Sequence, residues 1–226
     1  MSSAKLILFD IDGTLVDTGG AGARSWAWAF ERLFGRRIDI AEHSTAGMTD
    51  PAIGRITFTE VMEREPTATE LTRLMASYQS VLPDYVASSP DYRVLAGVTE
   101  LLERLTGAGM LLGLTTGGLE AAAHAKLGRG RLNHFFLFGG YGSDSEDRIA
   151  LTRAAVDRGT SMLDAPLDPG DVFVVGDTPL DVAAAEGVGA VSVAVASGRY
   201  GVDELSAAGA DHVLASLADP FPGGPV

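Results

Sequence analysis

The sequence predicts an α/β fold in which a parallel sheet is covered by helices on both faces. Short, continuously apolar segments alternate with longer stretches of helical periodicity along most of the chain. Uninterrupted apolar strands are typical of parallel sheets that are buried on both faces. One long stretch, from about Gly20 to Tyr92, interrupts this alternation because it carries only helical patterns. The alternation predicts a three-layer, Rossmann-like core, and the interruption predicts an inserted α-helical domain.

The expected elements can be given by residue range. The strands are expected at 5–11, 110–115, 171–175 and 191–195, with two weaker ones at 135–138 and 212–214. The helices of the core are expected at 97–107, 119–127, 149–158 and 181–186. The helices of the insert are expected at 24–34, 51–65 and 70–86. We therefore assign residues 1–18 and 93–226 to the α/β core and residues 19–92 to the helical insert.

Composition excludes several classes of protein. The chain has 226 residues, with 17 Lys and Arg against 30 Asp and Glu, and a net charge of −13. Such an acidic chain is poorly suited to nucleic acid, because binding there depends on Lys and Arg that neutralise phosphates. The absence of cysteine excludes a disulfide scaffold, a cysteine-ligated zinc site and thiol catalysis.

No apolar stretch approaches the ~20 residues that a membrane-spanning helix requires. The apolar segment Leu6-Ile-Leu-Phe9 is too short for a signal peptide, and we interpret it as a buried strand. These features fit a cytoplasmic enzyme that does not associate with membranes. Whether the chain is a monomer or a homodimer is left open.

Polar residues follow three of the expected strands. The first strand ends in Asp10 and Asp12, the second ends in Thr116, and the third ends in Asp177, with Asp181 one helical turn on. In an open parallel sheet, ligands bind beyond the carboxyl ends of the strands, so these side chains are expected to converge. Clustered carboxylates repel one another, and a hard divalent cation such as Mg²⁺ offsets that repulsion.

Asp10 and Asp177 are therefore the candidate carboxylate ligands of a magnesium ion. Thr116 and the backbone of Gly117 are suited to an anion, because glycine permits close approach and a helix N-terminus follows. Taken singly, each residue has a simpler explanation: an aspartate after a strand is often a turn former or helix cap, and threonine is common in strands. The joint pattern at three strand ends favours a phosphate-binding metal site.

Three motifs resemble those of the haloacid dehalogenase-like hydrolase superfamily. Residues 10–18, Asp-Ile-Asp-Gly-Thr-Leu-Val-Asp-Thr, resemble its first motif, residues 112–117 its second and residues 174–181 its fourth. The helical insert resembles the α-helical cap of this family. Nearly the whole chain is covered, and the branch that it resembles most is the phosphoglycolate-phosphatase-like one. The resemblance implies a Mg²⁺-dependent phosphatase that acts on a small phosphorylated metabolite.

The resemblance also implies a role for each residue. Asp10 would be the nucleophile that forms an aspartyl-phosphate, and Asp12 the general acid and base. The implied metal ligands are Asp10, Asp177, Asp181 and the backbone carbonyl of Asp12. Substrate contacts would come from Gly13, Thr14, Gly117 and Thr49. For Thr49, capping of the helix that begins at Pro51 is an equally good explanation.

The sequence departs from the family at the third motif, which usually supplies a lysine. Residues 144–149, Asp-Ser-Glu-Asp-Arg-Ile, contain no lysine, and Arg148 is the positional match. Lys126 is the rival, about ten residues beyond Thr116 on the expected helix. At 1.5 Å per residue this is roughly 10 Å or more along the helix axis, a long reach for lysine. We therefore favour Arg148 as the residue that takes the place of the usual lysine. For either residue the alternative is an exposed charge on the surface, and this alternative is stronger for Lys126.

Three other functions are weighed against the phosphatase. A mutase of the β-phosphoglucomutase type would use the same Asp10 and Asp12 but return the phosphoryl group to a sugar. A haloacid dehalogenase is disfavoured, because displacement of halide needs no acid such as Asp12. A protein that keeps the fold but only binds or regulates is also possible, since fold alone does not determine function.

Overall fold

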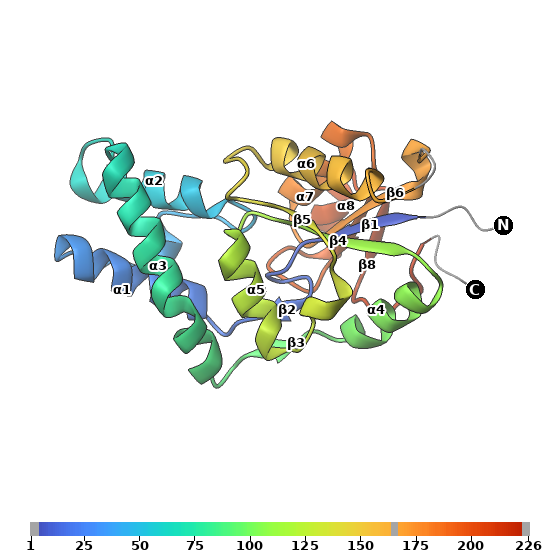
Figure 1. Cartoon of the computed structure of the whole chain (residues 1–226), viewed down its shortest axis with the longest axis horizontal. Coiled ribbons are helices and arrows are strands. Elements are labelled where there is room, and N and C mark those ends of the chain that lie inside the picture. The colour runs from blue at the N-terminus through green and yellow to red at the C-terminus, as the bar shows by residue number, and fades with distance from the viewer. Residues whose placement is uncertain (1–4, 164–166, 223–226) are drawn as a thin grey trace.

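A six-stranded parallel sheet forms the centre of the computed structural model, which describes residues 5–163 and 167–222 (Figure 1). The strand order is β5-β4-β1-β6-β7-β8, and every neighbouring pair is parallel. The strands are β1 (Leu6–Phe9), β4 (Leu111–Thr116), β5 (Gly139–Tyr141), β6 (Val172–Gly176), β7 (Val191–Val195) and β8 (His212–Leu214). Residues 1–4, 164–166 and 223–226 of the expected core range lie outside the described residues.

Helices cover both faces of the sheet, as the sequence predicts. On one face, Ile7 and Phe9 of β1 share a core with α4 (Val98–Gly107) and α5 (Glu120–Arg129). On the other face, Leu6 and Leu8 share a core with α6 (Arg148–Thr160) and α7 (Pro179–Val188). A short helix, α8 (Val202–Ala207), packs near β7 and β8. Successive side chains of a strand point to opposite faces, which is why one apolar segment serves two cores.

Three helices make up most of the insert and lie beyond one end of the sheet (Figure 1). They are α1 (Ala21–Phe34), α2 (Asp50–Met62) and α3 (Ala68–Ser88), with a short 3-10 turn, η1 (Ile40–Glu42), between the first two. They share an apolar core that includes Trp26, Phe30 and Phe58, together with Leu119 and Ala122 of the core domain. A two-stranded antiparallel sheet of β2 (Val16–Asp17) and β3 (Arg93–Val94) stands at the junction.

The weak strand expected at residues 135–138 is wrong. A 3-10 turn, η2 (Asn133–Phe135), ends there, and the strand is β5, which begins at Gly139. The apolar segment is instead explained by Phe136, which is buried in the core and packs edge-on against Phe9 at 6.1 Å between ring centroids. The sequence pattern also did not reveal β2, β3, α8 or the 3-10 turn η3 (Pro169–Asp171).

Within residues 5–163 and 167–222, no helix combines the length and the apolar composition that crossing a bilayer requires.

Gly140 of β5 allows α6 to pack closely on the sheet. A Cβ atom at this position would lie 1.9 Å from the backbone oxygen of Leu151. Gly140→Ala is expected to lower the free energy of unfolding by about 1–3 kcal/mol, because helix and strand must separate. Gly107→Ala is the control, since nothing lies within 4 Å of its added Cβ. Urea denaturation of the wild type and both variants measures this. A Gly140→Ala variant as stable as the wild type would contradict the close packing.

Candidate active site

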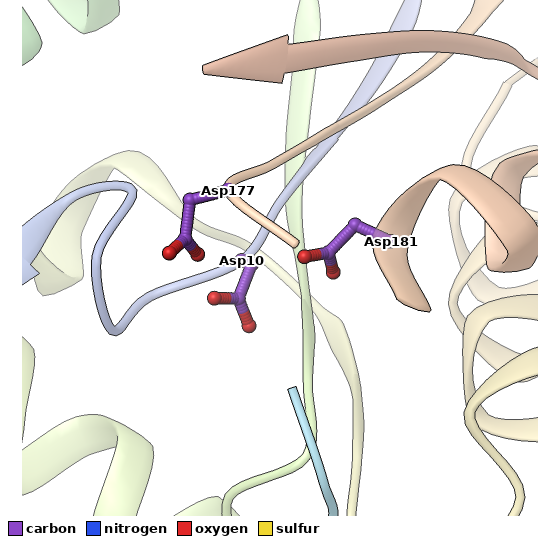
Figure 2. A group of neighbouring side chains, drawn as sticks. All are labelled: Asp10, Asp177 and Asp181. Carbon is purple, nitrogen blue, oxygen red and sulfur yellow. The ribbon is translucent and has the colours of Figure 1, made fainter. Parts of the chain in front are cut away.

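Three carboxylates converge at the carboxyl end of the sheet (Figure 2). Asp10 follows β1, Asp177 follows β6, and Asp181 lies in the first turn of α7. One oxygen from each lies within 4.8 Å of the others, and all three residues are buried. The backbone NH of Asp10 donates to the carbonyl of Val175 at 2.8 Å, so the pairing of the two strands continues up to the site. The sheet therefore determines where these carboxylates meet.

The local sequence explains how Asp177 and Asp181 come so close to the backbone. Thr178 and Asp181 form a capping box at the start of α7, in which Asp181 Oδ2 accepts from the Thr178 backbone at 3.0 Å. Gly176 permits this, because an added Cβ would lie 2.2 Å from the Asp181 carboxyl carbon. Gly13 has a φ of +82°, and a Cβ there would lie 2.3 Å from Asp177 Oδ2.

Arg148 forms hydrogen bonds with two of these carboxylates. It is the first residue of α6, and its guanidinium donates to Asp10 Oδ1 at 2.9 Å and to Asp181 Oδ1 at 3.0 Å. Its Nη1 donates to the carbonyl of Gly47 in the insert at 3.0 Å. The buried guanidinium thus holds the candidate nucleophile, the α7 carboxylate and a loop of the insert together. It lies in the site, as the favoured assignment requires.

Burial and mutual repulsion shift the acidities of the carboxylates. Burial, together with the charges of Asp181 and Asp12, raises the pKa of Asp10 to about 7, although Arg148 opposes the shift. Burial and the charges of Asp10 and Asp181 raise the pKa of Asp177 to about 8. Crowded buried carboxylates favour proton uptake unless a cation offsets the repulsion. Oxygen donors of this kind suit a hard divalent cation, so the donor set fits a metal site.

The sequence disfavoured Lys126 because of the long reach from its helix, yet the structure brings its side chain to the site. Its buried Nζ lies 2.5 Å from Asp12 Oδ2, at the cavity between core and insert. The error came from counting only the rise along α5. Side chains on a helix lean toward its N-terminus, so an extended lysine reaches back over the preceding turn. Both candidate cations therefore reach the site, Lys126 at Asp12 and Arg148 at Asp10.

Asp50 and Tyr78 of the insert complete the surroundings of Lys126, and sequence reasoning missed both. Asp50 NH donates to the carbonyl of Gly117 at 2.7 Å, and its Oδ2 accepts from the NH of Leu119 at 2.9 Å. Burial raises the pKa of Asp50, and Lys126 opposes that shift. Burial alone would lower the pKa of Lys126, but Asp12, Tyr78 and Asp50 outweigh it and raise the pKa.

No sequence signal singled out Asp50 or Tyr78. Asp50 directly follows the capping residue Thr49 and reads as an acidic residue in the first turn of α2. Tyr78 reads as one apolar position of an amphipathic helix, and in the structure it stacks on Trp26 with ring centroids 4.4 Å apart. Their approach to Lys126 depends on how the insert docks on the core.

The remaining expected residues divide into two groups. Thr116 and Gly117 line the cavity, and Thr116 Oγ1 accepts from the Gly118 NH at 3.2 Å. Gly13 and Thr14 instead contact Asp177. The Thr14 hydroxyl donates to Asp177 Oδ1 at 3.3 Å, and Gly13 lies against the same carboxylate.

For Thr49 the structure shows the capping role that was the alternative explanation. Its hydroxyl accepts from the NH of Ala52 as the N-cap of α2, and Thr49 is not among the described residues that line the cavity. The same hydroxyl also donates to the carbonyl of Glu146 at 3.2 Å.

The site residues face a cavity of about 340 Å³ between the core and the insert. On the core side it is lined by Asp10, Asp12, Thr116, Lys126 and Arg148, among others. On the insert side the larger lining side chains are mostly apolar, with Trp26, Ile40 and Ile53 among them. The arrangement can hold an anionic group against the core and an attached organic group against the insert.

Lys126 and Asp50 should behave as one network in folding. Each of Lys126→Met and Asp50→Asn should destabilise the protein, because each leaves a partner without its charge. The double variant should lose less than the sum, with a coupling of about 1 kcal/mol. Urea denaturation of the four proteins measures this coupling. The control is Lys126→Met combined with Asp84→Asn, because Asp84 is an exposed residue of α3. If the stability losses added within about 0.5 kcal/mol in both double variants, the network would be contradicted.

Comparison with known proteins identifies the family of this chain. A family model described as haloacid dehalogenase-like hydrolase matches residues 4–189. A protein of Dickeya dadantii (strain 3937), named probable phosphatase IndB, is 30% identical over 209 residues, which is 90% of this chain and 86% of that protein.

Solved structures share the fold along nearly the whole chain. CbbY from Rhodobacter sphaeroides, solved in complex with phosphate, has a TM-score of 0.75 at 22% identity and covers 96% of each chain. A protein described as a predicted phosphoglycolate phosphatase from Haemophilus somnus 129PT has a TM-score of 0.74 at 21% identity and covers 97% of each chain. With its family model, its fold and its curated relative in agreement, this chain belongs to the haloacid dehalogenase-like hydrolase family.

Proposed function

We propose that this protein hydrolyses a small phosphomonoester through an aspartyl-phosphate on Asp10, with magnesium as its cofactor. The observation that carries the proposal is that each of two neighbouring aspartates at the cavity is paired with its own cation. Asp10 is buried among carboxylates and held by Arg148, whereas Asp12 is half-exposed and held by Lys126. One carboxylate is thus fixed as a nucleophile, and the other can exchange protons. The names of relatives such as IndB support a phosphatase.

Asp10 and Asp177 would hold the metal ion, with the backbone carbonyl of Asp12. Asp181 suits this role less well, because Thr178 occupies its Oδ2 and Arg148 its Oδ1. We therefore assign Asp181 to positioning Arg148. A bound magnesium ion would neutralise the crowded carboxylates and draw charge from the phosphoryl oxygens.

In the first step, Asp10 attacks phosphorus and the bond from phosphorus to the alcohol oxygen breaks. Asp12 donates a proton to that oxygen, so the alcohol leaves neutral. Arg148 keeps Asp10 oriented, and Thr116 and Lys126 face the transferring group from the cavity wall. Positioning and charge stabilisation supply most of the catalysis of phosphoryl transfer.

In the second step, Asp12 accepts a proton from water as that water attacks the phosphorus of the aspartyl-phosphate. The bond to Asp10 breaks, inorganic phosphate leaves, and both carboxylates return to their starting states. Lys126, 2.5 Å from Asp12, holds the carboxylate that exchanges these protons in place.

A variant without the nucleophile should be inactive. Asp10→Asn is expected to lower metal-dependent phosphate release from p-nitrophenyl phosphate at least about a thousandfold, because the amide cannot form the acyl-phosphate. Asp157→Asn, an exposed change on α6, should leave release unchanged. Colorimetric phosphate assays with and without magnesium measure both. Equal rates for Asp10→Asn and the wild type would refute a covalent role for Asp10.

Metal binding should be visible in thermal stability. Magnesium is expected to raise the melting temperature of the wild type by several degrees, since a ligand that binds only the folded state stabilises it. Asp177→Asn should abolish this rise. The same variant should melt higher than the wild type in chelator, because one of the crowded carboxylates is removed. Scanning calorimetry measures both effects, and a full magnesium response in Asp177→Asn would assign the metal elsewhere.

A further inference from the structure

On its insert side, the part of the cavity lining that the structure describes offers a substrate no positive charge. Its main lining side chains are Trp26, Ile40, Met48, Asp50, Ile53 and Tyr78. Among the described residues between 20 and 78 that line the cavity, none is lysine, arginine or histidine. The charged side chain there is Asp50, which is buried and close to Lys126. A leaving group that enters this half meets mostly apolar walls, the neutral hydroxyls of Ser44, Thr45 and Tyr78, and one carboxylate.

The two buried cations on the core side already have carboxylate partners. Arg148 donates to Asp10, Asp181 and the carbonyl of Gly47. Lys126 is paired with Asp12 and lies beside Asp50. Both face the position of the reacting phosphoryl group, so neither is available for a second anion deeper in the insert.

Arg199 is the remaining cation among the described lining residues. It is exposed and lies in the loop after β7, next to Gly198, whose backbone approaches Asp177. It therefore belongs to the core side of the cavity. From that position it can attract a phosphate ester of any kind.

The insert is fastened to the core around this cavity. Asp50 binds the backbone at Gly117 and Leu119, and Arg55 of α2 forms an ion pair with Glu146 at 2.5 Å. Gly117 packs so closely that an added Cβ would lie 2.5 Å from the carbonyl oxygen of Met48. These contacts keep the apolar wall of the insert against the core side of the cavity, and a charged group packed on that wall without a cation beside it is costly.

We propose that the physiological substrate is the phosphomonoester of an uncharged alcohol with an apolar face, and that a second carboxylate or phosphate on the leaving group is excluded. This rests on the proposed phosphatase function. It departs from the phosphoglycolate-like expectation, since the glycolate leaving group carries a carboxylate. It also disfavours the mutase alternative, because a bisphosphate would place its second phosphate against the insert. Selection of this kind acts through an unpaired charge in the disfavoured complex.

Two aryl esters that differ in one charge test the proposal. Phenyl phosphate and 4-carboxyphenyl phosphate share a ring and a scissile bond, and only the second carries a carboxylate. The wild type, with magnesium, is expected to show a kcat/KM at least about tenfold higher for phenyl phosphate. Thr45→Arg, which places a cation in the cavity lining, should reduce this ratio by raising kcat/KM for the carboxylated ester. Thr72→Arg adds the same charge on exposed α3 outside the lining and should leave the ratio unchanged.

The outcomes separate the two proposals. Equal rates for both esters, or a preference for the carboxylated one, would overturn charge exclusion while leaving the phosphatase function intact. If the preference for the carboxylated ester then disappeared in Arg199→Ala, Arg199 would be the anion site instead. If neither ester nor p-nitrophenyl phosphate released phosphate, the phosphatase function would fail, and the substrate proposal with it.

Discussion

The repulsion among Asp10, Asp177 and Asp181 is the constraint around which the rest of the site is organised. Three buried carboxylates within 4.8 Å are unfavourable unless positive charge and hydrogen bonds offset them. Arg148 supplies a permanent charge with several donors in a fixed geometry. The capping box of α7 and the glycines beside the carboxylates supply the remaining support. The residual imbalance, visible in the raised pKa values, is what a divalent cation would relieve.

The insert takes part in this balance as well as covering the site. The carbonyl of Gly47 accepts from Arg148, and Asp50 lies with Lys126 next to Asp12. Asp10 and Asp12 are therefore each linked, through a cation, to the insert. Docking of the insert and the electrostatics of the site are coupled in this way.

Much of the core was predictable, because its elements follow from local patterns. The apolar segments predicted β1, β4, β6 and β7, with their ends within two residues of those found. Buried parallel strands need apolar side chains on both faces, and that requirement is written directly in the sequence. The strand predicted at residues 135–138 was wrong for the same reason. Phe136 is apolar because it is buried, although its segment is not a strand.

The sequence by itself determined that Asp10, Thr116 and Asp177 would gather at one edge, because parallel strands bring their carboxyl ends together. Only the tertiary structure decided which cation serves which carboxylate. The direction of Lys126 and the approach of Asp50 depend on how α5 and the insert pack, and packing joins residues far apart in the chain. Local periodicity carries no information on such contacts, since helix patterns specify a buried face but not the residue that it meets.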